Sequence, residues 1–256
     1  MTMKTTPAEA ARLALACLDL TTLGDNDTET EVAALAVRAR GPLGPPAALC
    51  VWPRLAAFAR REAPAGVAIA AVANFPHGGT DVEAAVRDAA VIVDAGAQEV
   101  DVVLPWRAFA AGDTAAAAAV LRAVRRACED RVLKVILETG ELADDALIRR
   151  AAALALAEGA DFLKTSTGKV PVGATPAAAR ALLETIAATP GNRAGFKASG
   201  GVRTVADAAV YAALTRELLG AEALTPQRFR LGASGLLNDI EAVLGGGVAA
   251  PPSASY

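Results

Sequence analysis

The sequence predicts an α/β protein that folds as one (β/α)8 barrel, the TIM-barrel architecture, over residues 1–256. Short apolar segments typical of buried strands alternate with longer Ala-rich segments typical of helices. Eight such pairs follow one another, and successive strands end about 23 to 35 residues apart, which is the length of one βα unit. A doubly wound open sheet is the alternative architecture that the same alternation allows.

The eight predicted strands are short and apolar, as the buried strands of a parallel barrel are. They cover residues 16–20, 47–52, 67–73, 99–104, 132–138, 161–165, 194–198 and 228–233. Helical patterns fill the intervals, with clear examples at residues 81–95, 114–128, 144–158, 176–188 and 204–219.

Residues at the ends of these segments support the predicted helices. Thr175 and Thr204 are predicted N-caps; a proline follows the first, and an acidic residue lies in the first turn after the second. Glycines follow the last helical residue of three segments, where a positive φ is common, at Gly96, Gly159 and Gly220.

No change of composition divides the chain, so we expect a single domain. Only the two ends are predicted to be flexible: residues 1–6, and a tail from about residue 245 to 256 that is rich in Gly, Pro and Ser. No apolar run approaches the roughly 20 residues that cross a membrane, and the N-terminus does not resemble a signal peptide. We therefore expect a cytoplasmic protein with no membrane partner.

Composition argues against several kinds of site. The three cysteines, Cys17, Cys50 and Cys128, are odd in number and far apart, which fits neither a disulfide framework nor a zinc site. A single histidine, His77, leaves little from which to build a His-rich metal site or a Ser-His-Asp triad. The net charge is -3 and no basic stripe with interleaved aromatics occurs, so nucleic acid is not an expected partner.

Lysine is rare in this chain, and two lysines lie at the ends of adjacent predicted strands. Only five of the 25 basic residues are lysine, and two of these five, Lys164 and Lys197, close the sixth and seventh strands. The carboxyl ends of barrel strands form the active site. Like charge and partial burial disfavour two ammonium groups side by side, so one lysine should have a lowered pKa and react as a neutral amine. Alternatively, each lysine forms an ion pair with a neighbouring acid.

Other polar or reactive residues close the predicted strands: Asp19, Cys50, Asn74, Asp101, Glu138, Thr165, Ser199, Gly232 and Ser234. Asp101, embedded in an apolar strand, is either a counter-ion to a barrel lysine or a general acid and base, and the two roles are compatible. Lys134 shares the strand parity of Glu138, which predicts a charge pair between them in the barrel core.

Glycines also mark the last two predicted strands. Gly200 and Gly201 follow Lys197 and precede a helix, and Gly232 and Ser234 lie before another helical segment. Glycine loops and helix N-termini at these two places form the phosphate site of many barrels, because their N–H groups point at the anion. The pattern favours a phosphorylated substrate, although ordinary turns also use glycine.

With these residues in place, the chain resembles the deoxyribose-phosphate aldolases, which are Schiff-base (class I) aldolases. The resemblance runs over nearly the whole length, and its most specific segment is FLKTSTGK at residues 162–169. The other matching segments are LDLTTL at 18–23, NFPHG at 74–78, EVDVV at 99–103, ETGEL at 138–142, GFK at 195–197, GGVR at 200–203, GAS at 232–234 and the terminal Tyr256.

The resemblance implies a role for each matching residue. Lys164 would form the Schiff base, Lys197 would lower its pKa and take part in proton transfer, and Asp101 would donate and accept protons. The residues implied to bind the substrate and its phosphate are Gly200, Gly201, Gly232, Ser234, Thr167 and Lys169, and Tyr256 would contribute from the tail. Ser199 and Gly235 depart from the family pattern, which implies one phosphate-binding hydroxyl fewer.

The implied reaction is the reversible cleavage of 2-deoxy-D-ribose 5-phosphate to D-glyceraldehyde 3-phosphate and acetaldehyde, a lyase step in deoxyribose phosphate catabolism. It needs no metal and no organic cofactor. Its partners are the phosphosugar and acetaldehyde, and a homodimer is expected. Two alternatives stay open: another Schiff-base aldolase or transaldolase that acts on a different phosphosugar, and a non-catalytic barrel that binds a phosphosugar.

Overall fold

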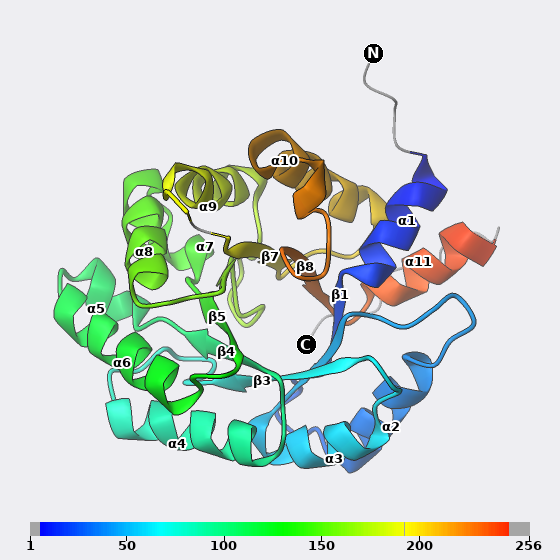
Figure 1. Ribbon diagram of the computed structural model, residues 1–256, viewed down its shortest axis with the longest axis horizontal. Helices are drawn as coiled ribbons and strands as arrows, with labels where there is room; N and C mark the ends of the chain where they lie inside the picture. Colours follow the sequence, from blue (N-terminus) through cyan, green and yellow to red (C-terminus); the bar gives the residue numbers. More distant parts are fainter. Residues whose placement is uncertain (1–5, 192, 246–256) are drawn as a thin grey trace.

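The computed structural model describes residues 6–191 and 193–245, in which eight parallel strands close a barrel in sequence order (Figure 1). The strands are β1 (Leu18–Thr21), β2 (Ala48–Val51), β3 (Ala68–Ala73), β4 (Glu99–Val103), β5 (Val132–Ile136), β6 (Phe162–Lys164), β7 (Gly195–Ser199) and β8 (Phe229–Ala233). All eight predicted strands are present, and β1 pairs with β8. The predicted barrel is therefore confirmed, and the open sheet is excluded.

A ring of helices surrounds the strands (Figure 1). The longer helices are α1 (Pro7–Ala16), α2 (Glu29–Arg38), α3 (Ala56–Glu62), α4 (Val82–Asp94), α6 (Thr114–Ala127), α8 (Asp145–Ala157), α9 (Pro176–Ala188), α10 (Val205–Leu219) and α11 (Leu236–Gly245). Short helices lie in the connections, namely η1 (Pro53–Leu55), α5 (Trp106–Ala110), α7 (Thr139–Leu142) and η2 (Ala221–Ala223). None of the helices in residues 6–191 and 193–245 has both the length and the apolar character needed to cross a membrane.

The predicted helix caps are present. The Thr175 hydroxyl accepts a hydrogen bond from the N–H of Ala178, and Thr204 forms a capping box with Asp207. These contacts satisfy N–H groups that have no partner within their own helix. The three predicted terminal glycines have positive φ angles: 75° at Gly96, 88° at Gly159 and 88° at Gly220.

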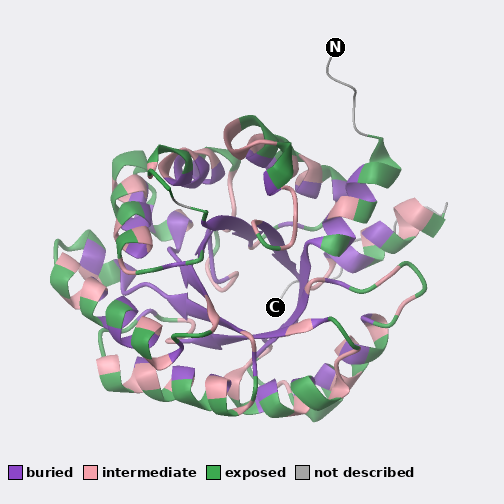
Figure 2. Cartoon of the chain, in the orientation of Figure 1, coloured by how far each residue is buried: buried purple, intermediate pink, exposed green. Residues whose placement is uncertain are grey.

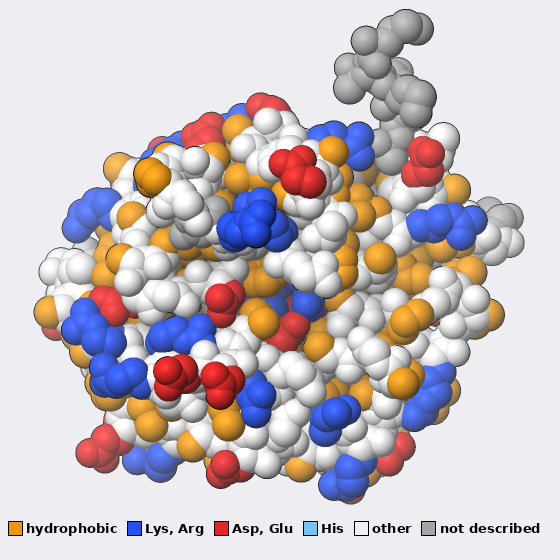
Figure 3. Space-filling model, in the orientation of Figure 1, with side chains coloured by type: hydrophobic (Ala, Val, Ile, Leu, Met, Phe, Trp, Pro, Cys, Tyr) orange, Lys and Arg blue, Asp and Glu red, His pale blue; other side chains and the backbone are white. Residues whose placement is uncertain are grey.

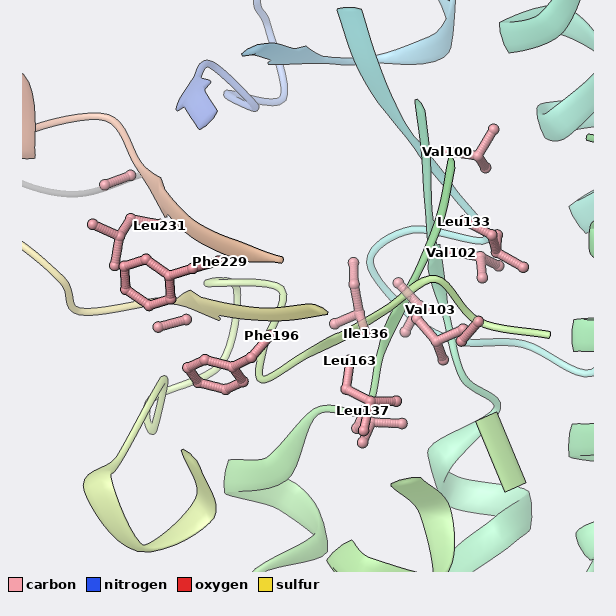
Figure 4. Close-up of a cluster of buried hydrophobic side chains, with 14 of the residues drawn as sticks. Val100, Val102, Val103, Leu133, Ile136, Leu137, Leu163, Phe196, Phe229 and Leu231 are labelled. Atoms are coloured by element: carbon pink, nitrogen blue, oxygen red, sulfur yellow. The ribbon is translucent and has the colours of Figure 1, made fainter. Parts of the chain in front are cut away.

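Side chains alternate along the strands, and the two faces of the barrel wall differ in kind. The strands are buried except at the first residues of β3 and β5, which are partly exposed (Figure 2). The cluster in Figure 4 includes Val100, Val102, Leu133, Leu163, Phe196, Phe229 and Leu231, which pack in the main hydrophobic core. The residues between these apolar positions are charged: Asp101, Lys134, Lys164, Lys197 and Arg230. Because successive strand residues point to opposite faces, the charged side chains share the inside of the barrel.

Candidate active site

Seven charged side chains meet inside the barrel, and all are nearly or fully buried. They are Asp19 on β1, Glu99 and Asp101 on β4, Lys134 on β5, Lys164 on β6, Lys197 on β7 and Arg230 on β8. Contacts between strands that are not neighbours, such as β4 and β7, show that these side chains meet across the barrel interior. Acidic and basic side chains are visible in a hollow at the centre of the ring (Figure 3).

Asp101 lies at the centre of this charge cluster and contacts three lysines. Its Oδ2 atom accepts from Lys164 Nζ at 2.9 Å and from Lys197 Nζ at 2.8 Å, and its Oδ1 atom accepts from Lys134 Nζ at 2.7 Å. Lys164 and Lys197 are directly opposite each other in the register of β6 and β7. The three residues expected to carry the chemistry, Lys164, Lys197 and Asp101, therefore lie in direct contact.

The two neighbouring lysines have opposite pKa shifts. Burial lowers the pKa of Lys164 and Lys197 adds to this effect, whereas Asp101 opposes it. Burial also acts against the charge of Lys197, but Asp101 and Asp19 raise its pKa well above the ordinary value. Lys164 is thus the amine that loses its proton more readily, and Lys197 is the cation beside it.

Asp101 and Asp19 keep their charge although they are buried. Burial alone would raise the pKa of Asp101, but Lys134, Lys164 and Lys197 lower it well below the ordinary value. Asp19 behaves alike, because Lys197 and Arg230 outweigh its burial. The cluster holds four basic and three acidic groups, so it is electrically neutral when Lys164 is uncharged.

The predicted charge pair of Lys134 with Glu138 is wrong. Lys134 Nζ instead lies 2.5 Å from Glu99 Oε2 and 2.7 Å from Asp101 Oδ1. Strand β5 ends at residue 136, and Glu138 has a left-handed φ of 56°, so strand parity does not extend to it. Its carboxylate accepts hydrogen bonds from the hydroxyl of Thr167 at 2.6 Å and from the N–H of Thr167 at 3.1 Å.

An apolar wall faces the charge cluster from the other side of the barrel. Leu23, Cys50, Ala70 and Val72 form a separate buried group, against which two partly buried rings pack, those of Trp52 and Phe75. The register places Val72 opposite Asp101 on the adjacent strand. Burial raises the pKa of the Cys50 thiol, so this cysteine is a protonated part of the wall. Cys50 of this wall also acts on the pKa of Lys164, so the wall lies near the lysine whose pKa burial lowers.

The glycine loop after β7 packs against the loop after β6. Gly200 and Gly201 both have a φ of 83°, a conformation that side chains disfavour. A Cβ atom on Gly200 would lie 2.9 Å from the Cα of Gly173. Thr167 and Lys169, which belong to the loop after β6, therefore lie in the loop adjoining these glycines. Lys169 Nζ also donates to Asp25 Oδ1 at 2.9 Å.

The residues expected to bind phosphate differ in their place in the structure: Gly232 lies within a strand, whereas the others lie in loops after strands. Gly232 lies inside β8, where an added Cβ would be 2.9 Å from Lys197 Cε and 2.9 Å from Ser199 Cβ, so it makes room for the lysine. Ser234 follows the strand and precedes α11. The N–H groups of Gly201, Ser234 and Gly235 have no hydrogen-bond acceptor in the described part of the chain. Tyr256 and the tail from residue 246 lie outside the described residues.

Three members of the charge cluster were absent from the expected site: Asp19, Glu99 and Arg230. Asp19 was recognised only as a residue that closes a strand. Glu99 shares the parity of Asp101, and Arg230 shares the parity of Gly232, so alternation along the strand was the available signal. Within residues 6–191 and 193–245, no group of three or more His, Cys, Asp or Glu side chains is suited to hold a metal ion.

Comparison with known proteins assigns the family. The sequence pattern of the DeoC/LacD family of aldolases matches residues 13–240. A deoxyribose-phosphate aldolase from Agrobacterium fabrum is 47% identical over 253 residues, which is 98% of this chain and 97% of that protein. The chain belongs to the DeoC/LacD aldolase family. As an aldolase it is a lyase, an enzyme that breaks or forms a carbon–carbon bond.

Solved structures share the fold of this DeoC/LacD aldolase. The apo form of a candidate deoxyribose-phosphate aldolase from Toxoplasma gondii ME49 has a TM-score of 0.85 and 26% identity, and covers 94% of this chain and 98% of its own. The tetrameric deoxyribose phosphate aldolase from Aeropyrum pernix has a TM-score of 0.68 and 26% identity, with 93% and 92% covered. The barrel and its order of strands are thus common to proteins of this name.

Proposed function

We propose that this aldolase reversibly cleaves 2-deoxy-D-ribose 5-phosphate to D-glyceraldehyde 3-phosphate and acetaldehyde through an imine on Lys164. One observation carries the proposal: Lys164 shares a single carboxylate oxygen with Lys197, whereas every other cation of the cluster contacts two or more carboxylates. A buried lysine with so little compensation is the one that reacts as a neutral amine. The names of the relatives support the substrate.

Imine formation begins when Lys164 Nζ attacks the aldehyde carbon of the open-chain sugar. A carbon–nitrogen bond forms, a proton moves from the nitrogen to the oxygen, and a carbinolamine results. A second proton then reaches the hydroxyl group, which leaves as water, and an iminium ion remains. Asp101 Oδ2 lies 2.9 Å from Lys164 Nζ and 2.8 Å from Lys197 Nζ, so Asp101 can pass protons between the charged lysine and the reacting atoms.

Cleavage uses the iminium ion as an electron sink. The C3 hydroxyl gives up its proton and becomes the carbonyl of D-glyceraldehyde 3-phosphate, while the electron pair of the C2–C3 bond moves toward the nitrogen. The resulting enamine takes a proton at C2, and water adds to the new iminium ion. Acetaldehyde leaves, and Lys164 is again a free amine. Every step uses side chains of the charge cluster together with water.

The phosphate is proposed to bind at the loops after β7 and β8 and at the start of α11. This placement is supported by the N–H groups of Gly201, Ser234 and Gly235, which have no backbone acceptor among the described residues, and by the hydroxyl of Ser234. The start of α10 is already satisfied: Asp207 accepts from the N–H of Thr204 at 2.9 Å, and Asp239 accepts from that of Val205 at 2.6 Å. When phosphate binds, the ammonium group of Lys169 would leave Asp25 and pair with the phosphate.

The proposal extends to the setting of the enzyme. We expect a single catalytic domain with a contribution from Tyr256, a role in deoxyribose phosphate catabolism in the cytoplasm, and a homodimer as the smallest assembly. The relative from Aeropyrum pernix is a tetramer. A measurement of mass in solution by light scattering distinguishes a dimer from a tetramer.

Reductive trapping tests the proposed chemistry. The enzyme is incubated with acetaldehyde and cyanoborohydride, with and without EDTA, and the modified peptide is identified by mass spectrometry. The expected result is an ethyl adduct on Lys164 in both conditions. Lys164→Arg keeps the charge but cannot form the imine, so it should show neither adduct nor turnover. The absence of an adduct on Lys164, or turnover by Lys164→Arg, would refute the imine on Lys164.

The same assay separates this reaction from those of other Schiff-base aldolases. Dihydroxyacetone phosphate replaces acetaldehyde as the donor, and the two rates of carbon–carbon bond formation with D-glyceraldehyde 3-phosphate are compared. Turnover with acetaldehyde and none with dihydroxyacetone phosphate is expected. The opposite preference would assign a different phosphosugar.

A further inference from the structure

Arg230 joins the charge cluster from the end of the barrel opposite the proposed substrate site. Its Nη1 atom donates to Asp19 Oδ1 at 2.5 Å, and its Nη2 atom donates to Glu99 Oε1 at 2.7 Å. The backbone carbonyl of Pro226 accepts from its Nε atom. The guanidinium group thus links β1, β4 and β8, and the geometry of its fork holds both carboxylates in place.

A charged cavity lies behind Arg230. It has a volume of about 810 Å³ and is lined by Glu99, Val132, Phe162 and Ala194, which lie at the amino ends of β4 to β7, together with Arg230. Substrate binds at the carboxyl ends of barrel strands. Arg230 therefore has no contact with the reacting atoms, and any influence on the reaction passes through Asp19 and the charge of the cluster.

Asp19 connects Arg230 to the reacting lysines. One carboxylate oxygen accepts from Arg230, and the other contacts Lys197 Nζ. The hydrogen bond from Arg230 keeps the Asp19 carboxylate oriented toward Lys197. Lys197 therefore contacts two carboxylates, those of Asp19 and Asp101, and keeps its proton. Lys164 then has to share Asp101 with a fully charged neighbour.

The charge of Arg230 cannot be neutralised, and this sets the proton count of the cluster. Three carboxylates balance three cations, and a guanidinium keeps its proton at any pH that the protein tolerates. Two of the three lysines can therefore be charged without giving the cluster a net positive charge. Lys164 has the fewest carboxylate contacts, so it is the lysine expected to be neutral. The titratable and charged groups of the barrel interior that act on this site are Cys17, Asp19, Cys50, Glu99, Asp101, Lys134, Glu138, Lys164, Lys197 and Arg230. On the cavity side, the charged residues that line the cavity together with Arg230 are Glu99, Arg125, Glu129, Asp130, Arg131, Asp161 and Arg193.

We propose that Arg230 is a positioning residue of the aldolase reaction: it orients Asp19 toward Lys197, and its permanent charge leaves Lys164 as the base without a proton. The inference rests on the proposed imine chemistry. It also explains why β8 carries arginine where β6 and β7 carry lysine. A lysine at position 230 could lose a proton itself and relieve the excess charge there.

The test is the pH dependence of trapping on Lys164 with acetaldehyde and cyanoborohydride. Lys197 lies between Lys164 and Arg230 in the sheet register, so the Cα atoms of those two residues are about 10 Å apart, and a separation of this order is taken for their charges. At that distance, one buried charge moves the midpoint of the trapping profile by about one pH unit. Arg230→Met should raise the midpoint by this amount, and Glu99→Gln should lower it.

Two further variants complete the design. The double variant Glu99→Gln with Arg230→Met has the original charge balance, so its midpoint should return toward that of the wild type. Arg228 lies just before β8, outside the cluster, and donates to the carbonyl of Ala194. Arg228→Met should therefore leave the midpoint unchanged. Melting temperatures confirm that each variant is folded.

Opposite shifts of the trapping midpoint in Arg230→Met and Glu99→Gln indicate electrostatic control. A general loss of packing would shift the midpoints of both variants in the same direction. Equal midpoints in all variants, or shifts in one direction, would overturn the role of Arg230. If Arg230→Met does not fold, Glu99→Gln decides alone, because its midpoint must fall. Absence of any adduct on Lys164 in the wild-type enzyme would instead refute the proposed function.

Discussion

At the scale of single residues, the number of carboxylates around each cation determines which one gives up its proton. Lys134 contacts Glu99 and Asp101 closely, and Lys197 contacts Asp19 and Asp101. Among the carboxylates of the described residues, Lys164 contacts Asp101 alone. A buried charge without adequate partners is unstable, so the fold supports a neutral Lys164 and charged neighbours. The reactivity proposed for Lys164 follows from this unequal supply of carboxylates.

We predict that Lys164→Met changes the pH dependence of stability. In the unfolded chain the lysine keeps its proton up to about pH 10.4, whereas in the folded protein its pKa is lowered. The wild-type free energy of unfolding should therefore rise with pH between these two pKa values, by up to about 1.4 kcal/mol per pH unit. Lys164→Met should lack this slope and be more stable at neutral pH, which urea unfolding at several pH values measures.

Lys197→Met is the matched control for this prediction. It removes a charged lysine from two buried carboxylates, so it should destabilise the protein by about 3–5 kcal/mol at neutral pH. A loss of similar size in Lys164→Met would show that Lys164 is charged in the folded enzyme.

At the scale of elements, the alternation along each strand explains both the core and the site. Phe229 and Leu231 pack in the hydrophobic core, and Arg230 between them points into the barrel. Gly232, next on the inward face, has no side chain to compete with Lys197 for space. Strand β8 therefore supplies two side chains to the hydrophobic core, one charged side chain to the cluster, and the space that Lys197 occupies.

We predict that Gly232→Ala lowers activity by displacing Lys197. The new methyl group would lie 2.9 Å from Lys197 Cε, so the ammonium group must move away from Asp101. Displacement of a reacting group by about 1 Å can reduce the rate about 100-fold, and a loss of this order in kcat is expected. Gly245→Ala, where nothing lies within 4 Å, is the control. Equal kcat values for Gly232→Ala and the wild type would contradict the prediction.

Elements could be predicted from the sequence wherever a local pattern defines them. The long helices and their caps, such as Thr204 with Asp207, follow from residues close together in the chain. The short helices α5 and α7 were not predicted, because four or five residues contain too few positions to show a helical period. Glu138 was assigned the wrong partner because its left-handed φ ends the alternation that the sequence alone suggests.

At the scale of the whole molecule, closure of the barrel creates contacts that no local pattern contains. Lys164, Lys197 and Asp101 were predicted because the carboxyl ends of strands are the expected place for chemistry. Glu99 and Arg230 lie nearer the amino ends of their strands and meet only because β4 faces β8 across the closed barrel. The sequence predicted the residues proposed to react and a role for Asp101 as counter-ion to a barrel lysine, but not the ion pairs of Arg230 with Asp19 and Glu99.

Closure also makes the stability of the barrel depend on pH. The charge cluster joins β1 and β4 to β8, and two of its carboxylates, those of Asp19 and Asp101, have pKa values below those in the unfolded chain. A carboxylate with a lowered pKa contributes stability above its unfolded pKa, which is about 3.9 for Asp, and loses it as pH falls toward the folded value. Asp19 and Asp101 should therefore stabilise the barrel fully at neutral pH and progressively less below about pH 4.

We predict a steep loss of stability in acid that added salt hardly changes. Below about pH 4 the unfolded chain takes up protons at Asp19 and Asp101, whereas the buried cations keep these two carboxylates charged in the folded protein, and buried pairs are poorly screened. Urea unfolding from pH 7 to pH 3, at low and high salt, measures the effect. Glu83→Gln removes a highly exposed carboxylate and should follow the wild-type curve within about 1 kcal/mol. A wild-type acid transition that high salt shifts strongly would assign the loss to surface charges instead, because only exposed pairs respond to salt in that way.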